Sequence, residues 1–134
     1  MEKILIDANV IVRFLLKDNI EHFNKAFVIF SRLYNKQIFV EITEGVLLEV
    51  FYVLTKFYWI EKTEVISFLI VLLSEKNIVC WNKEILVNWL NISLKYNLDL
   101  VDWFLVAKSL NENIKIKTFD KKLLKVLNKY SNAD

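Results

Sequence analysis

The sequence has 134 residues, of which 55% are hydrophobic and 25% charged, so this composition excludes a disordered chain and indicates one domain over residues 1–134. The formal net charge of +2 neither requires nor excludes a polyanionic partner. The single cysteine, Cys80, excludes an internal disulfide and predicts a cytoplasmic protein kept in a reducing environment.

The chain alternates short strand-like segments with longer segments of helical periodicity. In chain order we expect a strand at 3–7, a helix or turn at 10–16, a helix at 20–34, a strand at 37–42, helices at 44–58 and 63–75, a strand at 77–81, a helix at 83–96, a helix from Val101, a strand at 114–119 and a helix at 121–130. This alternation predicts an α/β fold with a parallel sheet of about four strands, flanked by helices on both faces.

The most apolar stretch of the sequence lies at 65–73. It is too short to span a bilayer, which needs about 20 residues, so we expect no membrane association. The first residues lack the basic and apolar pattern of a signal peptide, which also agrees with a cytoplasmic location.

Acidic residues stand at unexpected places in apolar segments. Asp7 ends the first predicted strand, Asp120 follows the last one, and Asp102 opens the helix that leads toward it. Ligands of open α/β sheets bind beyond the carboxyl ends of the strands, where the strand order reverses. We expect Asp7 and Asp120 to end adjacent strands, and we add Glu49, the only charge in a largely apolar stretch.

Each acid also has a purely structural interpretation. Asp7, Asp102 and Asp120 stand where a helix begins, and aspartate is a preferred N-cap. Glu49 could mark a solvent face, although its uncharged helical neighbours favour a partly buried acid. If the acids converge, one or more of them takes up a proton unless a cation lies between them, and their hard oxygen atoms favour Mg²⁺ or Mn²⁺.

Taken in order, the segments "ILIDANVIVRFL", "EGVLLEVFYVL", "LDLVDWFLVAKSL" and "IKTFDKKL" resemble a PIN domain, and within that superfamily the VapC-type toxins of toxin–antitoxin pairs. The resemblance covers nearly the whole chain. It implies a single PIN-like domain that hydrolyses RNA as an endoribonuclease with Mg²⁺ or Mn²⁺. The resemblance further implies that the catalytic and metal-binding acids are Asp7, Glu49, Asp102 and Asp120, supported by Asn9 and Thr118. It also implies a homodimer and a groove for a cognate antitoxin.

The sequence departs from the family pattern at several places. Trp103 follows the third acid, where a small residue is usual, and Lys121 and Lys122 follow the fourth, where a further acid is common. The sequence also stops at "YSNAD", without the fifth strand that often follows the last helix. Asp99 is a nearby acid that we rank below Asp102, because it would precede the helix.

Basic and aromatic residues suggest partners. We expect weak RNA contacts from Arg13, Lys117, Lys121 and Lys122, although a solvated helix face would explain the lysines and Arg13 could pair with an acid. The segments 20–34 and 44–73 hold more aromatic residues than one small core can bury, which predicts an exposed apolar surface for a partner.

Two other functions compete with the ribonuclease. One is a non-catalytic PIN-like module that binds protein or RNA, and the retained set of four acids argues against it. The other is a phosphatase of the haloacid dehalogenase type, which we disfavour because "DANV" lacks a second aspartate two residues after Asp7. The sequence contains no arrangement typical of a covalent nucleophile, and we expect His22 to be a surface residue and Cys80 to pack in a strand.

Overall fold

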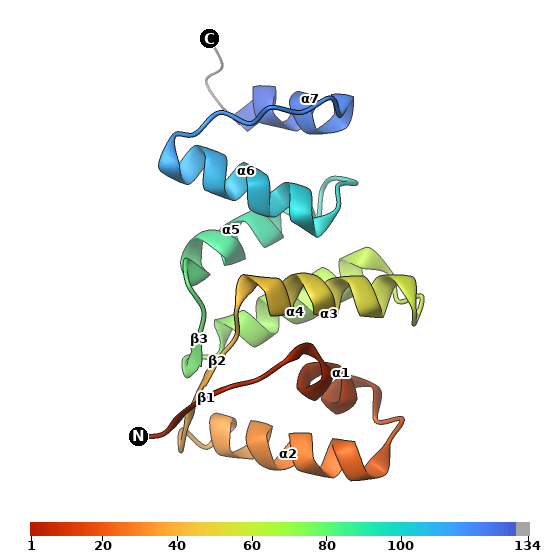
Figure 1. Cartoon of the computed structure of the whole chain (residues 1–134), viewed down its shortest axis with the longest axis vertical. Coiled ribbons are helices and arrows are strands. Elements are labelled where there is room, and N and C mark those ends of the chain that lie inside the picture. The colour runs from red at the N-terminus through yellow and green to blue at the C-terminus, as the bar shows by residue number, and fades with distance from the viewer. Residues whose placement is uncertain (131–134) are drawn as a thin grey trace. The chain divides into compact units, whose positions relative to one another are not determined.

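The structure is a computed structural model and describes residues 1–130. The chain divides into two compact units, Met1–Lys83 and Glu84–Asp134, and each is described by itself. The elements of the first unit are β1 (Lys3–Leu5), α1 (Ala8–Leu16), α2 (Ile20–Tyr34), β2 (Phe39–Glu41), α3 (Glu44–Lys56), α4 (Lys62–Ser74) and β3 (Ile78–Val79) (Figure 1). Those of the second are α5 (Lys83–Ser93), which starts at the boundary, α6 (Leu100–Glu112) and α7 (Lys121–Tyr130).

The sheet of the first unit is parallel, with the strand order β1-β2-β3, which confirms the predicted α/β class. Ile4 lies opposite Val40, and Val40 lies opposite Ile78, in the register of the three strands. Val40 and Ile78 are buried, whereas Leu5 in the next register position is 68% exposed. The buried row therefore fixes which way the strands face, because a shift by one residue would expose it.

The sheet described by residues 1–130 has three strands, not about four, because the strand predicted at 114–119 does not form. Residues 114–120 have no regular secondary structure. The segment instead begins with backbone bonds to the preceding helix, since the amide of Ile114 donates to the carbonyl of Ser109 at 3.0 Å. A sequence favourable to a strand needs a neighbouring strand to supply its ladder of hydrogen bonds. The strand order β1-β2-β3 runs in one direction along the sheet. These three strands therefore do not form the reversal of strand order at which a ligand site was predicted.

In the first unit α1 packs against both α2 and α3, and α4 packs against α3 (Figure 1). Phe14 of α1 stacks on Phe30 of α2, with ring centroids 4.2 Å apart. The first turns of α2 and α3 are fixed by their caps: Asn19 Oδ1 accepts from the amide of His22 at 3.0 Å, and Thr43 Oγ1 accepts from that of Val46 at 3.2 Å. The ring contact holds α1 against α2, and the two caps fix where α2 and α3 begin.

An aromatic cluster forms the core of the second unit. Trp89 of α5 stacks on Trp103 of α6 with centroids 6.0 Å apart, and Tyr130 of α7 meets Trp89 edge-on at 5.3 Å. The last helix is amphipathic: Leu123, Val126 and Leu127 are buried while its lysines are exposed. Residues 131–134, which belong to the terminal segment named in the fifth-strand prediction, lie outside the described residues.

The predicted surplus of aromatic surface is confirmed for the first unit. Within the segments 20–34 and 44–73, four aromatic side chains are more than half exposed: Phe27 (52%), Tyr52 (59%), Phe57 (71%) and Trp59 (84%). Others in the same helices, such as Phe30 and Phe51, are buried in the core. None of the helices within residues 1–130 has the length and apolar character needed to cross a membrane.

Candidate active site

Asp7 lies just beyond β1, where the chain leaves the sheet and enters α1. Its backbone is extended (φ −95°, ψ 178°), and its Oδ1 accepts a hydrogen bond of 3.2 Å from the amide of Val10. Asp7 is therefore the N-cap of α1, as the structural interpretation predicted. The side chain is nevertheless exposed, and this bond involves only Oδ1, so capping and binding of an external ligand are compatible.

Glu49 lies in the middle of α3 and is exposed, so the prediction of a partly buried acid is wrong. The buried residues of α3 are Leu47, Val50, Phe51 and Leu54, which share one face at helical spacing. Glu49 lies outside this buried face, on the side of α3 that is exposed to solvent. Its carboxylate makes no hydrogen bond or ion pair with residues 1–130, which leaves both oxygen atoms open to a ligand from solution.

Asp102 is the third residue of α6 and is half-buried. The N-cap of this helix is Asp99, whose carbonyl accepts from the amide of Asp102 at 3.0 Å. The capping interpretation of Asp102 is therefore wrong, because the residue lies inside the first turn. A carboxylate in that turn is favoured by the helix dipole. Asp99 is exposed and occupies the cap position without a side-chain capping bond.

Trp103, the large residue that follows Asp102, packs in the core of the second unit. Trp103 is fully buried, stacked on Trp89 and tilted against Tyr96 at a centroid distance of 5.5 Å. Its indole Nε1 has no hydrogen-bond partner among the described residues. The ring therefore anchors the first turn of α6, and with it the position of Asp102, through packing.

Asp120 joins the irregular segment to α7. Its Oδ1 accepts from the amides of Lys122 at 2.8 Å and Leu123 at 3.3 Å, so Asp120 caps the helix. Thr118 Oγ1 accepts in turn from the amide of Asp120 at 3.0 Å. The hydroxyl predicted to support this acid thus fixes its backbone, while the Asp120 side chain stays exposed.

The acids divide equally between the two units. Asp7 and Glu49 belong to Met1–Lys83, and Asp102 and Asp120 belong to Glu84–Asp134. Within neither unit, over residues 1–130, do three or more acid, histidine or cysteine side chains gather as a metal site. In kind, the donors fit a hard divalent cation, because all four are carboxylates and three of them are exposed.

A cavity of about 260 Å³ opens beside Asp7 between the first two helices, and we call it the α1–α2 cleft. On one side it is lined by the start of α1, with Asp7, Asn9, Val10 and Arg13. On the other side it is lined by one face of α2, with His22, Lys25, Ala26 and Ile29. The cleft therefore brings three of the predicted site residues together with two polar residues, His22 and Lys25, that were not predicted to take part.

The sequence contains a pattern that links His22 and Lys25 to one face of α2. His22, Lys25, Ala26 and Ile29 follow one another at i, i+3, i+4 and i+7, so they share a face of the helix. The sequence shows this spacing but does not show that the face lies against the start of α1.

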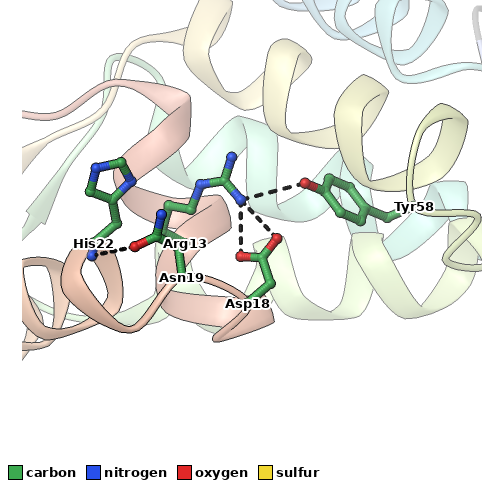
Figure 2. A network of polar contacts seen from close by, with 5 residues as sticks. All are labelled: Arg13, Asp18, Asn19, His22 and Tyr58. Atoms are coloured by element: carbon green, nitrogen blue, oxygen red, sulfur yellow. Dashed lines mark hydrogen bonds and ion pairs between the residues drawn. The ribbon is translucent and has the colours of Figure 1, made fainter.

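Arg13 pairs with an acid, as one of its two predicted roles required. Its Nη1 donates to both carboxylate oxygens of Asp18, at 2.9 and 2.8 Å, and to the hydroxyl of Tyr58 at 3.5 Å (Figure 2). The hydrogen bond from Arg13 lowers the pKa of Asp18, and the same bond raises the pKa of Arg13. The network thus fixes the guanidinium between the end of α1 and the α3–α4 turn.

The predicted lysines are exposed. Lys117 lies in the irregular segment, and Lys121 and Lys122 open α7 on the side away from its buried leucines. This is the arrangement of a solvated helix face, which places three positive charges next to Asp120 in sequence. An RNA path along them stays a prediction.

Comparison with known proteins identifies the family. The PIN domain family matches residues 4–129, so the chain belongs to the PIN domain family, as the four segments indicated. Members of this family are generally nucleases that use divalent metal ions. Comparisons with curated proteins and with solved structures give no significant match.

Proposed function

We propose that this protein is a metal-dependent endoribonuclease that hydrolyses RNA phosphodiester bonds. The observation that carries the proposal is the family match over residues 4–129, with Asp7 exposed just beyond the carboxyl end of β1. In α/β proteins this edge of the sheet is where ligands bind. The exposed Asp7 is therefore available for chemistry in addition to its capping role.

The cation would be held by Asp7, Glu49, Asp102 and Asp120. Mg²⁺ or Mn²⁺ suits this set, because carboxylate oxygens are the ligands that both ions prefer. Such a cation supplies polarisation of a phosphoryl oxygen and acidification of a water molecule. The backbone amides that bind Oδ1 of Asp7 and of Asp120 orient these carboxylates before any ligand arrives.

The remaining residues have supporting roles. Asp7 and Asp102 would hold the cation directly or through water, while Glu49 and Asp120 would complete the set or orient a water molecule. Thr118 fixes the backbone of Asp120. Lys117, Lys121 and Lys122 contact the phosphate backbone of RNA, with a weaker contribution from Arg13, which is already paired with Asp18.

We also propose that the protein is the toxin of a type II toxin–antitoxin pair, acts in the cytoplasm as a homodimer and binds a cognate antitoxin. This rests on the resemblance to VapC-type toxins and on the exposed Phe27, Tyr52, Phe57 and Trp59, a surface suited to a partner. Expression should arrest growth of a bacterial host, and a small protein encoded next to it should relieve the arrest. Harmless expression of a monomeric protein that still cleaves RNA would contradict the toxin role alone.

One observation favours a second function, a non-catalytic binding module. Asp7 and Asp120 both cap helices, and capping alone explains an aspartate at either position. In that case the acids stabilise the fold and bind no cation.

Cleavage of total RNA with Mn²⁺ or with EDTA tests the nuclease. We expect cleavage only with Mn²⁺, and its loss in both Asp7→Asn and Asp102→Asn. Asparagine caps a helix about as well as aspartate, so a structural role predicts no loss from Asp7→Asn. The exposed Glu64→Gln in α4 is the control and should cleave like the wild type. Cleavage in EDTA, or in both variants, would show that the site is misassigned.

A further inference from the structure

The α1–α2 cleft has an apolar floor and a polar rim. Its floor is aliphatic, formed by Val10, the buried Ala26 and the half-buried Ile29. At about 260 Å³ it is far larger than the roughly 30 Å³ of one water molecule, and slightly below the usual range of pockets for drug-sized ligands. This volume is sufficient for a single ring system of the size of a nucleobase.

The rim carries side chains that match the edge of a nucleobase. The Asn9 amide and the His22 imidazole each offer a donor and an acceptor, and both residues are exposed. The bond between Asn19 and His22 involves the His22 backbone amide, and Figure 2 shows the imidazole extending away from it. The cap therefore positions His22 without occupying its ring.

One positive charge at the rim, that of Lys25, is only weakly paired. The ammonium group of Lys25 lies 3.5 Å from Glu21, but both side chains are about three-quarters exposed, and such helical surface pairs are weak. Arg13, by contrast, is held by Asp18 and Tyr58. Lys25 is thus the cation of this cleft that can turn toward a phosphate at low cost.

An apolar peptide side chain is a poorer match for this cleft. It would cover the aliphatic floor but make no polar contact with Asn9, His22 or Lys25, whereas a nucleotide carries groups that match both the floor and the rim. A base inside a duplex is stacked and cannot enter, so the ligand must be unpaired.

We propose that the α1–α2 cleft binds one unpaired nucleobase of the RNA strand, with Lys25 contacting a phosphate beside it and Asn9 and His22 contacting its edge. The inference rests on the proposed nuclease function for the identity of the polymer. It makes the substrate single-stranded next to Asp7, and it assigns base preference to Asn9 and His22.

Binding in EDTA tests the cleft without cleavage. A fluorescein-labelled 12-nucleotide RNA of mixed sequence is titrated with the full chain by anisotropy, as a single strand and annealed to its complement. We expect the single strand to bind at least tenfold more tightly. The double variant His22→Ala/Lys25→Ala should weaken single-strand binding about tenfold, as expected for one or two lost hydrogen bonds. The matched charge control Lys76→Ala, exposed and outside the cleft, should change it less than twofold.

A second pair of variants tests the floor. Ile29→Trp fills the cleft and should weaken single-strand binding about tenfold, while Val28→Trp, on an exposed neighbouring position of α2, should not. The proposal is overturned if single and double strands bind equally, or if His22→Ala/Lys25→Ala binds like the wild type. It is also overturned if folded Ile29→Trp binds single-stranded RNA like the wild type.

The cleft and the nuclease can fail separately. A wild type that cleaves RNA, together with cleft variants that bind RNA normally, contradicts the cleft alone. A wild type that never cleaves, with the expected pattern of single-strand binding, contradicts the nuclease and supports the cleft as an RNA-binding site.

Discussion

Substitution of Asp120 separates its capping role from its proposed role at the cation. Its Oδ1 accepts from two backbone amides at the start of α7, at 2.8 and 3.3 Å. An asparagine oxygen can accept the same bonds, so Asp120→Asn should change the free energy of unfolding without cation by less than about 1 kcal/mol. If the four acids converge, relief of their repulsion raises the melting temperature of Asp120→Asn in EDTA. Asp120→Ala loses both bonds and should cost about 1 kcal/mol.

The response to cation should differ far more. A ligand that binds only the folded state at about 100 times its dissociation constant stabilises that state by about 2.7 kcal/mol. For a chain of 134 residues this corresponds to a rise in melting temperature of roughly 10 °C. Asp120→Asn should lose most of this rise, although it keeps the cap.

Thermal melts in EDTA and in saturating Mn²⁺ decide between the two roles. The control is Glu112→Gln, an exposed acid at the end of α6, which should keep the full response. Superimposable curves for the wild type and Asp120→Asn under both conditions would refute the reasoning and leave Asp120 as a cap only.

Three further predictions concern packing and titration. Trp103→Ala removes a fully buried ring and should lower the free energy of unfolding, measured by urea titration, by about 3–5 kcal/mol. A loss below about 1 kcal/mol would show that the aromatic cluster of the second unit does not anchor α6. Burial raises the pKa of the Cys80 thiol from 9.0 to about 11, so iodoacetamide at pH 8 should alkylate the folded protein far more slowly than the urea-unfolded protein. Because folding raises this pKa, the associated stability is present below pH 9 and is lost as the pH rises toward 11. Rapid alkylation of the folded state would contradict the burial of Cys80. The hydrogen bond from Arg13 lowers the pKa of Asp18 from its ordinary value of 3.8, so the stability contributed by this pair is present above pH 3.8 and is lost as the pH falls through the folded pKa. In thermal melts between pH 7 and pH 2, the melting temperature of Asp18→Asn should therefore fall less on acidification than that of the wild type. The same pH profile in both proteins would count against the pair.

Local patterns predicted the helices and the first strands well. The helix at 20–34 has its apolar residues at helical spacing and coincides with α2, and Asp7 stands where strand composition gives way to helix composition. In both cases the deciding physics lies within a few residues of the chain: side-chain periodicity and capping of free amides.

The errors arose where the outcome depends on distant partners. The segment 114–119 alternates apolar and basic residues as a strand does, yet no neighbouring strand pairs with it among residues 1–130. Glu49 was expected to be partly buried because its helical neighbours are uncharged, but α3 buries only the face that contains Leu47 and Val50. Which face of a helix is buried, and which strand finds a partner, is set by tertiary contacts that no short window of sequence contains.

The candidate site shows the same division. Asp7, Asn9 and Arg13 were predicted from one segment, and all three line the α1–α2 cleft. His22 and Lys25 belong to another helix, and their place beside Asp7 follows only from the packing of α2 on α1.

Binding of Mn²⁺ to variants from each unit tests the central claim most directly. Asp7 and Asp102 belong to different units. If they share one cation, Asp7→Asn and Asp102→Asn must each remove the same bound Mn²⁺ in titrations followed by electron paramagnetic resonance. The account predicts loss of that ion, and of RNA cleavage, in both variants, with Glu64→Gln unchanged. Full Mn²⁺ binding in either variant would contradict a single site built from these acids.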